Sequence, residues 1–371
     1  MEQLKKQGDR QSNLELLRIV AMLMVILVHY AGHGGGRLVP LPDGAVYGLD
    51  LYFGEWFQKT QAIALNAGGQ IGVNIFFLIS GYFLCTTTFK TERLLKTLAQ
   101  VFFYSAVMVF MLTAFGIMEF PREEWFKIFF PVMNNQYWFA TAYVLLYLVS
   151  PFFNIVVKNA TQKQFLWLLA VLVTMSSVVP TIVGLNEPYY MLFVVLYFIA
   201  AYIRIYGLTI MKKPLGAFLA YIAVYFGICV AMVWKHLTFD GTAEAKDAVV
   251  DYMSTGHKLW CLAASVLLFL AFKNLKIKNN KVINLLAGAS FGVYLIHDNK
   301  YFRRFLWDNI VQTEKYFYNN AYILYAVATA VAIYLACAVI DIIRLYALEK
   351  PLILLYRKIV PKIINRKKEK A

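Results

Sequence analysis

Long apolar stretches, separated by short polar segments, run through the whole chain. Each is close to the length of about 20 mainly apolar residues that a transmembrane helix needs, with some latitude for tilt. They lie near 12–32, 69–88, 94–118, 137–157, 164–184, 189–206, 215–234, 259–272, 282–297 and 319–346, and the eighth and ninth are the shortest. The pattern predicts an all-α integral membrane protein with about ten transmembrane helices.

The polar segments are too short to hold a soluble domain, since the longest runs only from about 33 to 68. We therefore expect a single transmembrane domain over 1–348, followed by a basic tail over 349–371. The start of the chain resembles a signal peptide, but Glu15 and Arg18 interrupt its apolar run and no clear A-x-A cleavage site follows. We interpret the first stretch as an uncleaved anchor.

Composition and charge support the membrane class. Hydrophobic residues make up 60% of the chain and charged residues 15%, with a mean hydropathy of +0.59, whereas a soluble domain is about 45–50% apolar and about 25% charged. The net charge of +15 would suit nucleic acid, but most of the 36 Lys and Arg residues lie in alternate loops and at the two ends. Basic loops favour the cytoplasmic side. The pattern therefore places both termini in the cytoplasm, attributes the charge to topology and anionic lipid, and predicts no nucleic-acid partner.

We expect neither metal-assisted nor serine-nucleophile chemistry. HEXXH does not occur, and the one match to GxSxG, GASFG at 288–292, lies within a predicted apolar helix. The four cysteines have neither the spacing of a disulfide framework nor that of a metal cluster. We expect no metal site.

Two ionisable residues lie within the first apolar stretch. Arg18 and His29 are eleven residues apart, so on an α-helix they fall within roughly 20° of one face and about 16 Å apart along the axis. Ionisable groups at membrane depth cost several kcal/mol and usually face protein interior or a wet cavity. The pair predicts a functional passage. Two alternatives stay open: Arg18 as an anchor to the inner headgroups, and His29 as a polar residue satisfied at the outer interface.

The first helix also carries a start signal. Ser12 followed three residues later by Glu15 matches a capping box, in which each side chain binds a backbone N–H at the helix start. Glu15 lies one turn before Arg18, within reach of an ion pair that lowers the cost of the buried guanidinium.

Five patches, in order along the chain, resemble the acyltransferase 3 family. They are LELLRIVAMLMVILVH at 14–29, GVNIFFLISGYFL at 72–84, QYWFATAYVLLYLVSPFFN at 136–154, SFGVYLIHDN at 290–299 and RLYALEKP at 344–351. The resemblance implies a ten-helix membrane acyltransferase that modifies sugars of cell-surface glycans, antibiotics or peptidoglycan.

Two positions depart from the family pattern. Asn74 stands where relatives often carry an acidic residue, and Arg93 and Lys96 stand where relatives often have an R-x-x-R pair. Lysine keeps the charge but loses the bidentate fork that suits phosphate. We expect Arg93 and Lys96, together with Arg18, to bind the phosphates of acetyl-CoA, and topology-setting charge is the alternative for this loop. Asn74 and Ser80 are expected to support the site, although close helix packing is the simpler role for Ser80.

Aromatic and polar residues gather at the predicted outer ends of the helices. Tyr137, Trp138, His297 and Asp298 are expected to bind the acceptor sugar by stacking and hydrogen bonding. An interfacial aromatic belt is the alternative for the two aromatic residues.

These observations together predict a membrane-bound O-acyltransferase of the inner or plasma membrane, with acetyl-CoA as co-substrate and no bound cofactor. In this hypothesis His29 acts as the general base toward a hydroxyl of a surface polysaccharide or glycolipid. An acyl-imidazole intermediate, a succinyl donor, a homo-oligomer and association with glycan-assembly proteins stay open. The rival interpretation is a transporter of a glycan intermediate or small solute, and a membrane scaffold is a third.

Overall fold

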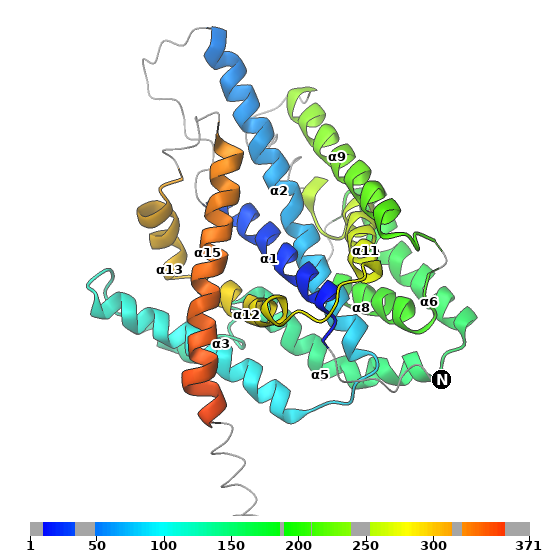
Figure 1. Ribbon diagram of the computed structural model, residues 1–371, viewed down its shortest axis with the longest axis horizontal. Coiled ribbons are helices and arrows are strands. Elements are labelled where there is room, and N and C mark those ends of the chain that lie inside the picture. The colour runs from blue at the N-terminus through cyan, green and yellow to red at the C-terminus, as the bar shows by residue number, and fades with distance from the viewer. Residues whose placement is uncertain are drawn as a thin grey trace, which may run out of the picture.

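The computed structural model describes residues 10–33, 49–185, 189–208, 210–238, 253–313 and 321–352, and over these ranges the regular structure is entirely helical (Figure 1). The longer helices are α1 (Ser12–His33), α2 (Leu49–Leu84), α3 (Thr91–Ala114), α5 (Trp138–Asn159), α6 (Gln162–Val173), α8 (Tyr189–Ile205), α9 (Pro214–Thr238), α11 (Leu259–Asn274), α12 (Lys281–His297) and α15 (Tyr322–Arg344). Shorter helical elements are η2 (Arg122–Glu124), α4 (Trp125–Phe129), η3 (Thr174–Val178), α7 (Val179–Val183), α13 (Phe302–Arg304), η4 (Phe305–Val311) and η5 (Leu345–Glu349). The all-α prediction is confirmed.

Seven helical segments are long and apolar enough to cross a membrane: Ser12–Gly32, Ala64–Leu84, Thr91–Ala114, Trp138–Asn159, Gln162–Val183, Pro214–Lys235 and Tyr322–Leu352. The shorter apolar helices α8, α11 and α12 occupy the three other predicted stretches. The chain is therefore an integral membrane protein. The total of ten crossings and the cytoplasmic placement of both ends stay predictions. Of the tail predicted over 349–371, the structure describes only 349–352, which continue the helical run of α15 and η5.

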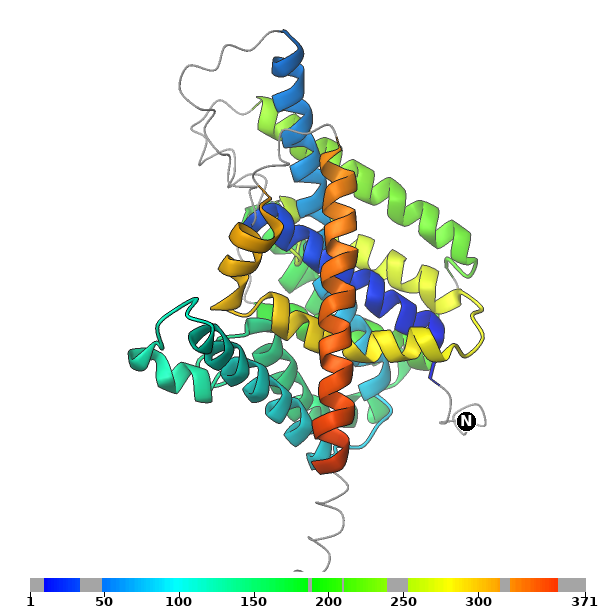
Figure 2. The same ribbon diagram turned by 60° about the vertical axis from the view of Figure 1, so that its left-hand side comes forward.

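Helix α1 lies in the middle of the bundle, against α2, α11, α12 and α15 (Figures 1 and 2). Its residues Leu17 and Ala21 are fully buried. Two glycines of α2 allow a close approach: a Cβ at Gly69 would collide with the side chain of Val28, and a Cβ at Gly72 would lie 2.6 Å from the carbonyl oxygen of Ala21. Small residues permit such close contact between membrane helices, so the seam between α1 and α2 depends on them.

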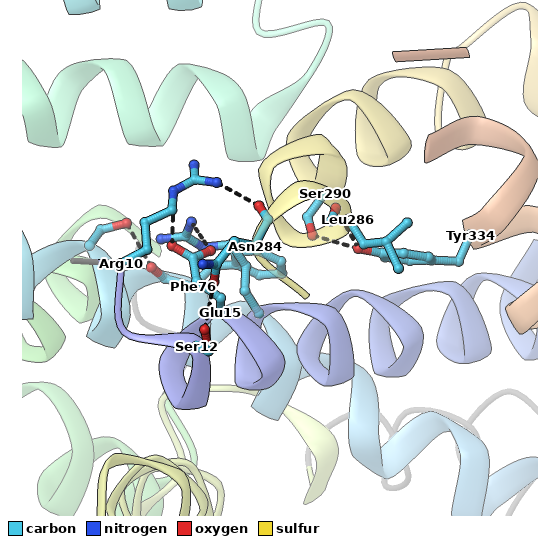
Figure 3. Close-up of polar contacts among 10 residues, drawn as sticks. Arg10, Ser12, Glu15, Phe76, Asn284, Leu286, Ser290 and Tyr334 are labelled. Atoms are coloured by element: carbon cyan, nitrogen blue, oxygen red, sulfur yellow. Dashed lines mark hydrogen bonds and ion pairs between the residues drawn. The ribbon is translucent and has the colours of Figure 1, made fainter. Parts of the chain in front are cut away.

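The capping box predicted at the start of α1 is wrong. Because α1 begins at Ser12, this residue occupies the first helical position. Its hydroxyl donates to Oδ1 of Asn284 (2.9 Å) and accepts from the backbone N–H of Asn280 (2.8 Å), which joins the start of α1 to the start of α12 (Figure 3). Glu15 instead accepts from Arg18 at 2.9 Å, which confirms the expected ion pair. A partner on a neighbouring helix has replaced the local cap.

A buried carboxylate joins α3, α12 and α15. Oδ1 of Asp341 on α15 accepts from Nε2 of Gln100 (2.9 Å), the hydroxyl of Tyr104 (2.8 Å) and Nε of Arg344 (2.8 Å). On its other side the Asp341 side chain packs against Gly292 of α12, where an added Cβ would collide with it. A charge in a low-dielectric interior needs such partners, and the absence of a side chain at Gly292 leaves the space for them.

We predict that Gly292→Ala lowers the midpoint of thermal unfolding by several degrees, because overpacking a buried contact costs about 1–3 kcal/mol. The matched control is Gly288→Ala, one turn earlier on α12, where the added Cβ would meet only the end of Arg10, at 3.5 Å. Thermal unfolding of both variants in the same detergent checks this. Equal midpoints for the two variants would contradict the proposed packing.

Candidate functional site

Two histidines from distant parts of the chain meet where α1 and α12 end. His29 lies one turn before the end of α1, and His297 is the last residue of α12. Nδ1 of His29 is 3.0 Å from Nε2 of His297, and the ring centroids are 5.1 Å apart. The side chain of His29 is 17% exposed, whereas His297 is fully buried. The structure thus brings together the expected general base and a residue expected to bind the acceptor.

The hydrogen bonds define the tautomers of this pair. Nδ1 of His297 lies 2.6 Å from the carbonyl oxygen of Val293, and since a carbonyl only accepts, this nitrogen carries the proton. When both rings are neutral, Nε2 of His297 is therefore an acceptor, and Nδ1–H of His29 donates to it. The lone pair of His29 is consequently on Nε2, which gives this ring the form that a general base requires.

A carboxylate stands beside the histidine pair. Asp298 follows the last residue of α12 and is buried, with Oδ1 4.0 Å from Nδ1 of His29 and 3.8 Å from Nη1 of Arg303. The C-terminal end of α12 adds the negative end of a helix dipole. Both charges would stabilise the imidazolium that forms when His29 takes up a proton.

A cavity of about 50 Å³ lies at His29. It is enclosed by residues of α1, α2, α5 and α12, namely Met22, Val25, Val28, His29, Gly69, Gln70, Val73, Phe76, Trp138, Phe139 and Tyr294. Most of these side chains are apolar, and Gln70, Trp138 and Tyr294 supply the polar groups besides the imidazole. The space is large enough for a few water molecules or one small acyl group.

Tyr137, which we expected to bind the acceptor, lies beneath the turn that follows α12. It is 1% exposed, and its hydroxyl donates to the carbonyl oxygen of Leu295 (3.2 Å) and accepts from Nδ2 of Asn299. Oδ1 of Asn299 in turn accepts from the backbone N–H of Tyr301 (3.0 Å). Tyr137 therefore holds this turn in place, and the neighbouring Trp138 lines the cavity.

Arg18 lies in the other half of α1, three turns from the histidine pair. Its side chain is 26% exposed, and its Nη1 is 2.9 Å from Glu15. Tyr143 of α5 interacts electrostatically with both Arg18 and Arg93. The guanidinium carbon of Arg93 also lies 5.9 Å from the ring centre of Tyr147, one turn further along α5. Two arginines from different helices are thus near enough to act electrostatically on the same tyrosine.

Lys96 does not join these two arginines. Its Nζ is 3.1 Å from the carboxylate of Glu92, and it lines a separate cavity between α3 and α15. The spacing of Arg93 and Lys96 suggested one shared phosphate site, but the two side chains contact different neighbours.

Asn74 and Ser80 also lie away from the histidine pair. Asn74 is fully buried, and its Nδ2 donates to the carbonyl oxygen of Gly256 (2.9 Å) and to the hydroxyl of Ser265 (3.1 Å), so it faces α11. The hydroxyl of Ser80 donates to the carbonyl oxygen of Phe76 (2.7 Å) within α2. Both residues contribute to helix packing in the described structure.

Sequence reasoning missed the contact between His29 and His297 and the position of Tyr143. Both histidines end apolar stretches on the side predicted to be outer, which was a usable signal. It did not say that α1 and α12 are neighbours, and ten helices can be arranged in many ways.

On the loops outside the spans, Glu124 connects the segment before α5 to the turn after α12. Its carboxylate accepts from Nζ of Lys300 (2.7 Å), the hydroxyl of Tyr301 (2.6 Å) and Nζ of Lys127 (3.0 Å). The hydrogen bonds from Lys300, Tyr301 and Lys127 lower the pKa of Glu124 from 4.5 to about 2. These contacts of Glu124 therefore hold Lys300 and Tyr301, just beyond Asp298, in place over a wide range of pH.

Hydrogen-bonded histidines beside a small cavity, inside a bundle of membrane-spanning helices, define a membrane-embedded site suited to acid–base chemistry. The chain belongs to the acyltransferase 3 family: the model of that family, described as an acyltransferase domain, matches residues 11–342. The match confirms the resemblance of the sequence patches, and the protein is an integral membrane acyltransferase. No curated protein and no solved structure shows a significant match to the chain.

We predict that Glu124→Gln lowers stability at neutral pH and that this loss disappears in acid. The pKa of Glu124 is lower in the folded protein, so its contribution is complete above about pH 4.5 and declines as pH falls toward 2. Unfolding midpoints of the wild type and the variant, measured from pH 7 down to pH 2, should draw closer below about pH 4.5 and nearly meet at pH 2. Glu123→Gln, an exposed neighbour, is the control and should match the wild type throughout. A gap between Glu124→Gln and the wild type that does not narrow in acid would contradict the assignment.

Proposed function

We propose that the protein transfers an acetyl group from acetyl-CoA to a hydroxyl of a sugar in a surface polysaccharide or glycolipid, with His29 as general base. The observation that carries the proposal is the hydrogen bond from His29 to His297, which leaves the lone pair of His29 on Nε2 beside a cavity. An imidazole, with an ordinary pKa of about 6.5, is well suited to this task near neutral pH.

In the proposed reaction, Nε2 of His29 takes the proton from the acceptor hydroxyl as its oxygen attacks the thioester carbonyl. The C–S bond then breaks, and the proton passes from His29 to the departing thiolate, which leaves as coenzyme A. His297 and Asp298 act on the charge that His29 carries between these steps, since the first accepts its Nδ1–H and the second lies 4.0 Å away. Neither residue needs to change its own proton count.

An acyl-imidazole on His29 is the second candidate route, since the same nitrogen could attack the thioester directly. The two routes differ when acceptor is absent. Incubation of the purified protein with radiolabelled acetyl-CoA would leave label on His29 only in the covalent route.

The proposed donor site is supported by the electrostatic interaction of Tyr143 with both Arg18 and Arg93. Because α1 is continuous from Ser12 to His33, Arg18 and His29 are separated by about 16 Å along its axis. A donor with its phosphates on the arginines could extend its pantetheine arm along α1 and bring the thioester toward His29. Lys96 lines another cavity, between α3 and α15, so we confine the donor site to the two arginines.

The cavity at His29 favours acetyl over succinyl. Among the described residues that line it there is no lysine or arginine to balance a succinyl carboxylate, and an unpaired charge in such a place is costly. The acceptor would enter past Trp138 and Asp298, on the side opposite to both termini. In this topology the basic tail over 349–371 lies at the cytoplasmic surface with anionic lipid.

We predict that His29→Ala lowers kcat for acetyl transfer by roughly 10²–10⁴-fold, as expected for loss of a general base. His297→Ala should lower kcat less and shift the pH profile, because His29 then loses the acceptor for its Nδ1–H. His33→Ala, one turn further along α1, is the matched control and should keep wild-type activity. Release of coenzyme A and transfer of labelled acetyl are the measurements, with membrane insertion confirmed for each variant.

Undiminished transfer by His29→Ala would rule out the base role. Failure of the folded wild-type protein to turn over any acetyl-CoA when glycan acceptors are present would instead favour a transporter. Mass spectrometry of surface glycans from cells with and without the protein would identify acyl group and acceptor together, as a difference of one acyl mass.

We predict that Arg93→Gln raises KM for acetyl-CoA about tenfold, since a charge-assisted bond to phosphate contributes about 1.4 kcal/mol or more. Lys96→Gln, on the same helix and one turn away, should leave KM unchanged. Steady-state kinetics with varied acetyl-CoA compare the two. An equal rise in KM for both variants would place Lys96 back in the donor site.

A further inference from the structure

A second cavity, of about 460 Å³, lies between α3 and the end of α15 and shares no lining residue with the cavity at His29. Much of its lining is apolar and is formed by Leu95, Ala99 and Phe103 of α3 and by Leu348 and Leu352 beyond α15. Three of these side chains, Leu95, Leu348 and Leu352, are exposed. Since α3 and the run that contains α15 are both long and apolar enough to cross a membrane, we take this apolar space to face lipid.

The rim of this cavity carries charges of both signs. Glu92 and Lys96 lie in the first turns of α3, 3.1 Å apart, and Arg344 and Glu349 lie at the end of the opposite helical run, 2.7 Å apart. The positive charges of Lys96 and Arg344 are thus balanced by the two carboxylates. A ligand that fits the rim must itself offer both a negative and a positive group.

Along α3 the lining changes from charged to apolar. Glu92 and Lys96 lie in its first two turns, whereas Phe103 lies twelve residues beyond Thr91, about 18 Å further along the helix. On the opposite run, Leu348 and Leu352 lie beside Arg344 and Glu349. A phospholipid has the same order of groups, with a charged headgroup followed by an acyl chain. The first turns of α3 would hold the headgroup and the wall from Ala99 to Phe103 the chain.

We propose that this cavity binds a membrane phospholipid whose headgroup combines a phosphate with a primary ammonium, of the phosphatidylethanolamine type. The phosphate matches Nζ of Lys96 and the ammonium matches the carboxylates of Glu92 and Glu349, all charge-assisted contacts. A purely anionic headgroup would meet those two carboxylates without a positive group of its own. The proposal is independent of the acyl-transfer chemistry.

The proposed lipid would also touch the network that connects three helices. Gln100 and Arg344 line the cavity, and both donate to Asp341, which packs against Gly292 of α12. A bound lipid would therefore bridge α3 and α15 directly beside the carboxylate that holds them, and would stabilise the bundle at this point.

The test uses the full-length protein in nanodiscs that contain equal amounts of phosphatidylethanolamine and phosphatidylglycerol, followed by native mass spectrometry of the lipids it retains. We expect the wild type to retain the ethanolamine lipid about tenfold over the glycerol lipid, a difference of about 1.4 kcal/mol. Ala99→Trp fills the cavity and should abolish this preference. Met111→Trp, at an exposed position of α3 outside the cavity, is the matched control and should keep it.

A second variant preserves the shape of the cavity. Glu92→Gln combined with Glu349→Gln removes the partners of the ammonium. Lipid should still be retained, but the ratio of ethanolamine lipid to glycerol lipid should fall toward one. Equal retention of both lipids by the wild type, a preference for phosphatidylglycerol, no retained lipid, or a preference unchanged in Ala99→Trp would each overturn the proposal.

Discussion

The hydrogen bond between Nδ1 of His29 and Nε2 of His297 is the interaction on which the proposed chemistry depends. A lone imidazole can carry its proton on either nitrogen, and only one tautomer presents a lone pair to a given side. Here the carbonyl of Val293 fixes the proton of His297 on Nδ1, and His297 in turn fixes that of His29. A backbone group thus selects the tautomer of a side chain on another helix, through a second ring.

The membrane interior explains why so much of the fold gathers around α12. Polar groups away from water need partners, and α12 meets three sets of them along its length. Asn284 binds Ser12 at its start, Gly292 makes room for Asp341 in its middle, and His297 binds the imidazole of α1 at its end. Any shift of this helix would disturb all three contacts, so the site and the helix packing are held by the same element.

Hydropathy predicted where the helices lie, because the length of an apolar stretch is a local property. Spacing within one helix also predicted a contact, because the ion pair of Glu15 with Arg18 is confirmed. The start of α2 at Leu49, about twenty residues before its apolar stretch, was not predicted, since a helix outside the membrane needs no apolar run.

Contacts between helices could not be predicted in the same way. Ser12 fits a local cap by its spacing, but Asn280 and Asn284, more than 250 residues away, bind it instead. The spacing of Arg93 and Lys96 fits one phosphate site. In the structure, however, Arg93 lies near the ring of Tyr147, whereas Lys96 pairs with Glu92. The family patches identified the histidines, yet nothing in one sequence states that their helices are adjacent.

The glycine at position 69 has a consequence for how acyl preference could change. It borders the cavity at His29, and on the other side it touches Val28 with no room for a methyl group. At this part of the wall the main chain of Gly69 packs directly on the side chain of Val28. A larger residue at position 69 would therefore push α1 away from α2 before it could narrow the cavity. A longer acyl group would have to be accommodated by shortening Val73 or Phe76 on the remaining wall, which leaves the spacing of the two helices intact.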